Sequence, residues 1–381
     1  MRRLWMSGLT FVVMLLVFVL AACGTADRTA QENSAATGGV GERSGSSSGD
    51  ASDQEARAET EPLKKVRIVR TINNMIFMPL FIAIDRGYFA EEGIEAEIIS
   101  MGGADATQAL LSGSVDFTAG NGSAIPLAYN QGSDDLIVTA NIVSTATASV
   151  AMRNPVVEEK GISIDMPIEQ RLKAFQGITY GVLGIGSADD TLLSLYLDIA
   201  GLERGKDVRV VAIGDSANMI AGLKQGQIDA FMASPPTPQT TVAEGYGTII
   251  IKGGEVEGTK NISWDALATH KNLVKKDPEL VRGVTRAIAR GNNFARNPQN
   301  LEETIRIAEK NFPNVDPQLI REGIEFMIEM DAWPEDARMT EEVWINQIRL
   351  NSYATEMKEI DTSEGYMWTN EFLEGLGGRA D

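Results

Sequence analysis

Two stretches of the chain share one pattern of apolar and polar positions. AEIISMGGADATQALLSGSVDF (96–117) aligns with RVVAIGDSANMIAGLKQGQIDA (209–230), and the offset is the 113 positions that separate Asp116 from Asp229. With its flanking residues, each copy predicts strand, helix, strand, helix and short strand, with β-branched residues in the strands and glycine at the turns. The repeat therefore predicts two α/β lobes, each a mostly parallel sheet flanked by helices, with a ligand cleft between the lobes.

The pattern becomes helical after Lys252. Asp277 followed by Pro278, and Thr340 followed by two glutamates, are typical helix starts. We expect this C-terminal part of the chain to return to the first lobe and to cover it.

The first residues have the order of a secretory signal. Arg2 and Arg3 precede an unbroken apolar stretch (11–20), which is shorter than the roughly 20 residues that a membrane span needs. The small residues that follow end at Cys23, the only cysteine, and this Leu-Ala-Ala-Cys order resembles the lipobox of bacterial lipoproteins. The resemblance implies cleavage before Cys23 and acylation of its sulfur, which would leave no thiol for disulfides or catalysis. The alternative is an uncleaved anchor helix.

The segment after Cys23 is rich in Gly, Ser, Ala, Thr and charged residues and contains a single Val as its only large aliphatic residue. It cannot bury enough apolar surface to offset its ordering entropy, so we expect a disordered tether with a reach of about 35 Å. The predicted organisation is a lipoprotein signal peptide (1–22), the lipidated cysteine with its tether (23–62), the first part of lobe 1 (63–150), lobe 2 (151–250), and a return to lobe 1 with C-terminal helices (251–381).

The loops beyond the carboxyl ends of the predicted parallel strands should line the cleft. They are 71–79, 101–107, 119–126, 183–191, 213–219 and 233–238. Plain helix capping explains the Ser, Asp and Thr of any single loop, but six convergent loops favour a small-molecule site. The residues expected to bind the ligand are Asn73, Asn74, Met75, Phe77, Gly103, Asp105, Asn121, Ser123, Ser187, Asp189, Thr191 and Ser216.

The charges on these loops indicate the class of ligand. None of the six contains Arg, Lys or His, and they carry Asp105, Asp189, Asp190 and Asp215. A strongly anionic solute would be expected to meet cationic side chains or several helix N-termini. We therefore predict a neutral or cationic small molecule, with the rings or thioether of Phe77, Met75 or Trp264 against it. Core packing is an equally good interpretation of Phe77 and Met75.

The chemistry available elsewhere in the chain is limited. The formal net charge of −19 argues against nucleic acid and anionic lipid surfaces as partners. His270 is the only histidine and has no cysteine near it, so we expect no metal site, no catalytic residue and no cofactor. Its expected role is structural.

Three stretches resemble the solute-binding proteins of bacterial ABC importers, in the group of sulfonate-, taurine- and nitrate-binding proteins and thiamine-pyrimidine-precursor binders. They are PLFIAIDRGYFAEEGIEAEI (79–98), ALLSGSVDFTAGNGSA (109–124) and AGLKQGQIDAFMASPP (221–236). The resemblance implies a type II periplasmic-binding-protein fold whose lobes close on a solute, with crossing strands near 147–154 and 248–254.

The function implied by the resemblance is the lipid-anchored, extracytoplasmic solute-binding component of an ABC importer. Its implied partners are a small solute, the permease subunits and, through the acyl anchor, the membrane, and we expect a monomer. Two alternatives stay open: an enzyme similar to the thiamine-pyrimidine synthases of this fold, which use their own histidine as an atom source, and a ligand-sensing lipoprotein. The sequence does not identify the solute, the permease or whether the host has an outer membrane.

Overall fold

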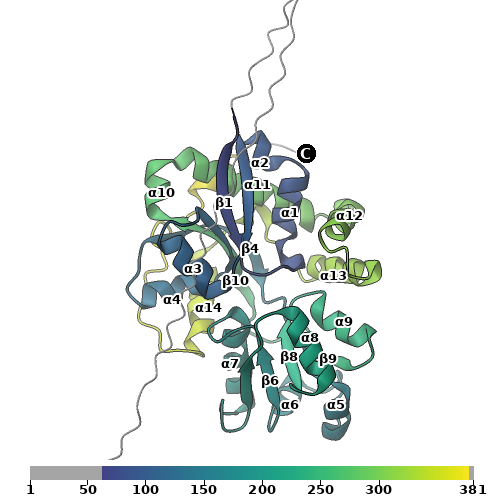
Figure 1. Ribbon diagram of the computed structural model, residues 1–381. Coiled ribbons are helices and arrows are strands. Elements are labelled where there is room, and N and C mark those ends of the chain that lie inside the picture. The colour runs from purple at the N-terminus through teal and green to yellow at the C-terminus, as the bar shows by residue number, and fades with distance from the viewer. Residues whose placement is uncertain (1–61, 377–381) are drawn as a thin grey trace, which may run out of the picture. The chain divides into compact units, whose positions relative to one another are not determined.

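The computed structural model describes residues 62–376 (Figure 1). The predicted signal peptide, the acylation site at Cys23 and nearly all of the predicted tether lie outside these residues. Within the described part of the chain, no helix combines the length and apolar character needed to cross a membrane.

The chain forms two five-stranded sheets with the same strand order. From edge to edge, the first sheet contains β2 (Ile94–Ser100), β1 (Lys64–Arg70), β3 (Phe117–Asn121), β10 (Lys260–His270) and β4 (Leu136–Thr145). The second contains β7 (Arg209–Ala212), β6 (Thr179–Val182), β8 (Ala230–Ala233), β5 (Ser149–Arg153) and β9 (Gly247–Ile251). In each sheet the first two pairings are parallel and the last two are antiparallel, so four of the five strands run the same way. The predicted two-lobed, mostly parallel α/β fold is confirmed.

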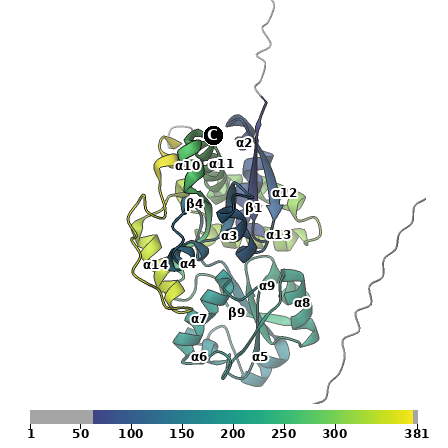
Figure 2. The same cartoon turned by 60° about the vertical axis from the view of Figure 1, so that its left-hand side comes forward.

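Helices flank both sheets (Figures 1 and 2). Before the second sheet begins, the chain forms the short η1 (Met75–Phe77), α1 (Met78–Asp85), α2 (Tyr88–Glu91), α3 (Gly103–Leu111) and α4 (Ala124–Asn130). The second sheet carries α5 (Asn154–Lys160), α6 (Ile168–Lys173), α7 (Ala188–Ala200), α8 (Ser216–Gln225) and α9 (Thr237–Ala243). After β10 come α10 (Lys271–Lys276), α11 (Pro278–Arg296), η2 (Pro298–Asn300), α12 (Leu301–Asn311), α13 (Pro317–Glu329), η3 (Glu335–Ala337), α14 (Glu341–Ser352) and η4 (Glu371–Leu373).

The two helix starts predicted from sequence have the expected caps. The Asp277 side chain accepts a hydrogen bond from the Leu280 N–H at the start of α11, and Thr340 does the same for Val343 in α14. Of these later helices, α11 packs on α1 and β4, and α14 packs on β10. The chain after β10 thus lies against elements of the first sheet.

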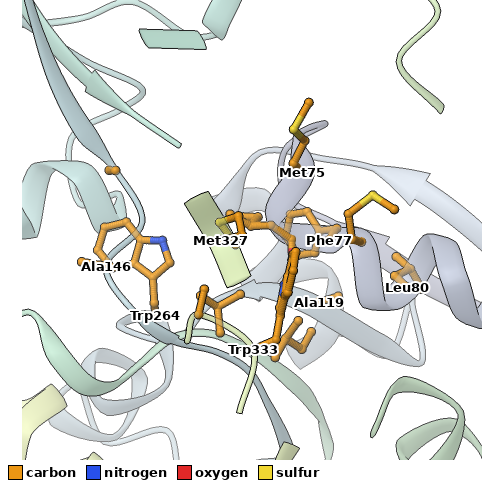
Figure 3. Packing of buried hydrophobic residues seen from close by; sticks show 14 of the residues in the cluster. Met75, Phe77, Leu80, Ala119, Ala146, Trp264, Met327 and Trp333 are labelled. Carbon is orange, nitrogen blue, oxygen red and sulfur yellow. The ribbon is translucent and has the colours of Figure 1, made fainter. Parts of the chain in front are cut away.

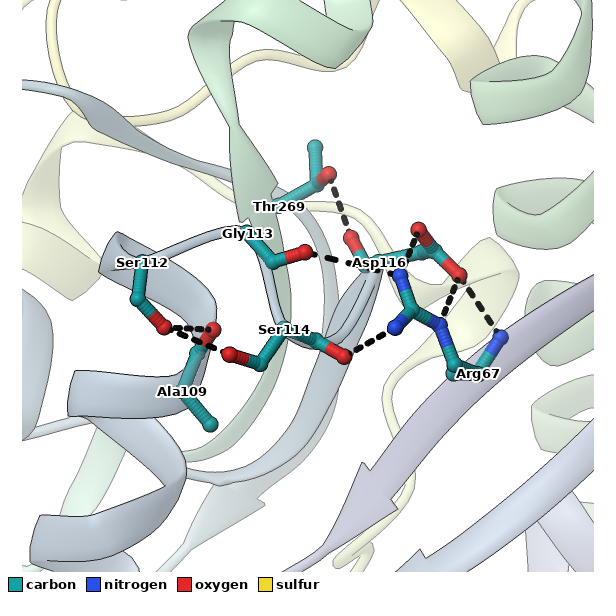
Figure 4. A network of polar contacts seen from close by, with 7 residues as sticks. All are labelled: Arg67, Ala109, Ser112, Gly113, Ser114, Asp116 and Thr269. Carbon is teal, nitrogen blue, oxygen red and sulfur yellow. Dashed lines mark hydrogen bonds and ion pairs between the residues drawn. The ribbon is translucent and has the colours of Figure 1, made fainter.

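The aspartates that align in the sequence repeat have the same structural role in both lobes. Asp116 accepts the backbone N–H of Arg67 at 2.9 Å and also pairs with the Arg67 guanidinium (Figure 4). Asp229 accepts the backbone N–H of Thr179 at 2.9 Å and pairs with Arg153. Each aspartate therefore fastens the start of one strand to the neighbouring parallel strand.

The chain crosses between the sheets twice, at 146–148 and at 252–259. The stretches predicted to cross, 147–154 and 248–254, lie mostly inside β5 and β9, so the crossings fall at one end of each. The two crossings touch, because Ala146 donates to the Thr259 carbonyl at 2.8 Å. At Gly253 a Cβ would lie 2.5 Å from the Thr147 carbonyl oxygen, so only glycine allows this approach.

The largest apolar core contains residues of both lobes, and η1 is part of it. Met75 and Phe77 are fully buried, and they pack with Met327 and Trp333 (Figure 3). The Trp333 indole donates to the Ile76 carbonyl at 3.1 Å, so this polar group is satisfied inside the core.

Candidate functional site

Two of the predicted ligand residues line a small pocket in the first lobe. Gly103 and Asn121 contribute to it together with Thr71, Thr118 and Ala266. Its volume is about 10 Å³, which is room for about one water molecule. In this conformation the pocket cannot hold an organic solute.

The other polar residues predicted in the first lobe hold local structure. Asn74 is buried and its Oδ1 accepts from the Ile76 N–H at 3.0 Å, which caps η1. Asn73 is exposed and accepts from the Arg70 guanidinium at 2.7 Å. Asp105 is also exposed, in the first turn of α3. None of these contacts requires a ligand.

Ser123 is tied to α14, an element that the sequence did not connect with it. Gln347 donates to the Ser123 hydroxyl at 2.8 Å, and Asn351 donates to the Ser123 carbonyl at 3.0 Å. All three residues are buried. Asn121 in turn accepts from the Ser123 N–H at 3.0 Å. Ser123 thus anchors the C-terminal helix to the loop after β3.

The aromatic and thioether groups predicted to contact the ligand lie in the core. Met75 and Phe77 are fully buried, and Trp264 is 3% exposed. Figure 3 shows all three among the packed apolar side chains. Their contacts in the structure are those of core residues.

Asp189 and Asp190 are adjacent in the first turn of α7, but their environments differ in a way that the sequence does not show. Asp190 pairs with Arg204 at 2.5 Å and accepts the Gly186 N–H at 2.8 Å. Asp189 is 5% exposed, and its Oδ2 has no hydrogen-bond partner in the described residues. Burial and the charge of Asp190 raise the pKa of Asp189 from 3.8 to about 7. Asp190 is therefore structurally satisfied, whereas Asp189 has unused acceptor capacity.

The remaining predicted residues of the second lobe sit at helix starts. The Ser187 side chain caps α7 by accepting from the Asp190 N–H at 3.2 Å, and the buried Thr191 hydroxyl donates to the Ser187 carbonyl at 3.1 Å. Ser216 is partly exposed at the start of α8, which is capped by Asp215. These contacts fix the loops at the carboxyl ends of β6 and β7.

Asp265 is a candidate site residue that the sequence analysis missed. It lies in β10, opposite Asn121 at the carboxyl end of β3, and the strand register shifts on both sides of it. Such irregularities redirect side chains and are common beside functional sites. Asp265 is 4% exposed, and burial together with the charge of Asp189 raises its pKa well above the usual value. An acid inside the apolar strand ISWDALATH was the available sequence signal.

Two tyrosines complete what we call the buried acid cluster, which consists of Asp189, Asp265, Tyr180 and Tyr196. Both tyrosines are fully buried, and neither hydroxyl has a hydrogen-bond partner in the described residues. Burial raises the pKa of each; Tyr196 and then Asp189 add to the shift of Tyr180, and Glu255 and then Asp189 add to the shift of Tyr196. The cluster draws Asp265 from the first sheet and the other three residues from the second lobe.

The environment of this cluster contains little compensating charge. Neither Asp189 nor Asp265 has an ion-pair partner among residues 62–376; Arg204 pairs with Asp190, the neighbour of Asp189. At the carboxyl end of β1, the half-buried Arg70 donates to Asn73 and to the Ser100 hydroxyl, and its guanidinium lies 5.2 Å from the Phe81 ring centroid. Burial lowers the pKa of Arg70, and it has no carboxylate partner in the described chain.

Other chemistry is sparse in the described part of the chain. Residues 62–376 contain no group of three or more His, Cys, Asp or Glu side chains that could hold a metal ion. The His270 ring nitrogen Nδ1 accepts from the Asn272 N–H at 3.0 Å and so caps α10.

The chain is similar in sequence to one protein family and in structure to several solved proteins. A model of the NMT1-like family matches residues 59–309. YtlA of Bacillus subtilis (strain 168), which is named as a binding protein, is 21% identical over 288 residues, covering 75% of this chain and 82% of YtlA. A solved structure from Bordetella bronchiseptica RB50 matches with a TM-score of 0.70 and 22% identity over 82% of this chain and 96% of that protein. The periplasmic aliphatic sulphonate binding protein SsuA from Escherichia coli matches with a TM-score of 0.58 and 16% identity over 76% of this chain and 85% of SsuA.

The matched family model spans well over half of the chain, and the structural matches agree with the two sheets described above. The chain therefore belongs to the NMT1-like family and has the two-lobed fold of the periplasmic binding proteins.

Proposed function

We propose that the protein is the extracytoplasmic solute-binding component of an ABC importer and captures a small organic solute between its lobes. One observation carries the proposal: the buried Asp189 Oδ2 of the second lobe has no hydrogen-bond partner in the described residues, and the buried Asp265 of the first sheet has no ion-pair partner there. Buried polar groups in native proteins are nearly always paired with protein, water or a ligand, and a molecule bound between the lobes would supply partners for these side chains. Relatives named as binding proteins support the same role.

Binding would act through closure of the lobes. A solute that contacts both lobes has more interactions in the closed state than in the open one, and this difference shifts the population towards the closed state. The two crossings at 146–148 and 252–259 are the only covalent links between the sheets within the described chain, so they would carry the hinge. The closed form would be the one that the permease subunits recognise.

The solute class can be tested directly. A thermal-shift screen followed by calorimetric titration should include taurine, an alkanesulfonate, nitrate, thiamine, its pyrimidine and riboflavin. We expect at least one small solute to raise the melting temperature in a concentration-dependent way and to be recovered unchanged. A protein that turns over the solute would support the alternative of an enzyme, and one that binds none of a wide metabolite panel would contradict the proposal.

We further propose that acylated Cys23 anchors the protein to a membrane, with the following segment as a tether. This part rests on the sequence alone. Labelling of expressing cells with a palmitate analogue should mark the wild-type protein and not the Cys23→Ala variant, and that variant should be released from membranes. Labelling of both proteins would refute the anchor.

A further inference from the structure

We propose that Asp189 and Asp265 form a binding site for a cationic organic group, such as a protonated amine, an amidine or a protonated nitrogen heterocycle. The cation would sit between the lobes with one carboxylate on each side. This inference rests on the proposed function and specifies the class of solute.

Both carboxylates are built into rigid elements and removed from water. Asp189 lies in the first turn of α7 and Asp265 lies at the irregular position of β10, and each is at least nine-tenths buried. The loop after β3 lies directly against β10 beside Asp265. A Cβ on Gly122 in this loop would lie 1.8 Å from the Ser263 carbonyl oxygen. Gly122 also donates to the Trp264 carbonyl at 3.1 Å. The position of Asp265 is therefore fixed before a solute arrives.

The charge at this place is unbalanced. A buried carboxylate is normally paired with a cation or protonated, because an isolated buried charge is very costly. The chain supplies Arg204 to Asp190 but no cation to its neighbour Asp189, and none to Asp265 among the described residues. A ligand with one positive charge would supply what is missing.

The surrounding groups suit an organic cation better than an anion or a metal ion. Tyr180 and Tyr196 are fully buried, and their unpartnered hydroxyls can accept from N–H donors. An anion would meet two carboxylates and would need a cationic partner. A divalent metal such as Ca²⁺ prefers six to eight oxygen ligands, more than two carboxylates and two phenols provide.

A site divided between the lobes also links binding to closure. The carboxylate of α7 belongs to the second lobe and that of β10 to the first, and α7 packs beside α14, which itself packs on β10 (Figures 1 and 2). Both carboxylates reach one cation only when the lobes are together. The cation would therefore favour the closed state through its differential contacts.

The test uses the whole protein and an extract of small metabolites. Wild type, Asp189→Asn, Asp265→Asn and the control Asp198→Asn are incubated with the extract and freed of unbound solute, and the retained molecules are identified by mass spectrometry after denaturation. Asp198 is a matched control because it lies on the same helix with an exposed side chain. The binding constant of the retained solute is then measured by calorimetry with each protein.

We expect wild type and Asp198→Asn to retain an organic cation with equal affinity. Each site variant should bind it at least about 30-fold more weakly, because truncating one side of a buried charge pair is costly. Retention of a neutral solute, an anion or a metal ion would overturn the cation site but keep the proposed binding function. Equal affinity in all four proteins would also overturn it. Retention of no solute by any protein would contradict the binding function itself, and the cation site with it.

Discussion

The contribution of Asp189 to the stability of the ligand-free protein should fall as pH rises from about 4 to about 7. The unfolded chain loses the Asp189 proton near pH 3.8, whereas the folded chain keeps it until about pH 7. Between these values the folded state binds more protons than the unfolded state, so the free energy of unfolding falls with increasing pH. Above pH 7 both states are ionised and this contribution is constant. Three pKa units at about 1.36 kcal/mol each make the loss about 4 kcal/mol.

Replacing Asp189 with asparagine, which has nearly the same shape and does not titrate, removes this contribution together with the effect of the Asp189 charge on the pKa of Asp265. We expect Asp189→Asn to have about the stability of wild type at pH 4 and to be more stable by several kcal/mol at pH 8, measured by urea unfolding at both pH values. Asp190→Asn is the contrasting variant. It should lose about 1–3 kcal/mol at pH 8, because it weakens the contacts with Arg204 and Gly186. Parallel pH profiles for wild type and Asp189→Asn would refute the reasoning.

Two further predictions concern contacts far from Asp189. Gly253→Ala should lower the free energy of unfolding by about 1–3 kcal/mol, because its Cβ meets the Thr147 carbonyl at 2.5 Å where the crossings touch; a melting temperature equal to wild type would contradict this packing. Gln347→Ala should cost about 1–2 kcal/mol by removing the bond to Ser123, and a double-mutant cycle with Ser123→Ala should give a coupling energy above about 0.5 kcal/mol. Additive effects of these two substitutions would show that the bond does not fasten α14.

The sequence predicts the fold well because the pattern of strands and helices is local in the chain and occurs once in each lobe. Asp116 and Asp229 match in sequence since each fastens one strand start to its neighbour, and α11 and α14 begin at the caps that Asp277 and Thr340 predict. The positions of the crossings were less predictable. Most of 147–154 and 248–254 belongs to β5 and β9, because an apolar β-branched stretch is as typical of a strand inside a sheet as of a strand that crosses between lobes.

The candidate site was only partly predictable, because burial there depends on contacts distant in the chain. The loop position of Asp189 predicts a ligand contact, but nothing in the sequence distinguishes Asp189 from Asp190. The two residues differ because Arg204, just after the end of α7, forms an ion pair with Asp190 only. Asp265 gains its position from pairing with Asn121, more than a hundred residues earlier. Phe77 was ambiguous between ligand and core, and its environment is set by late segments of the chain such as Trp333.

The structure of the protein with its retained solute tests the central claim most directly. We predict a positively charged nitrogen within about 3 Å of a carboxylate oxygen of Asp189 and of Asp265, with the two lobes closed around it. A solute bound elsewhere, or one whose uncharged or anionic part faces these two residues, would contradict the claim.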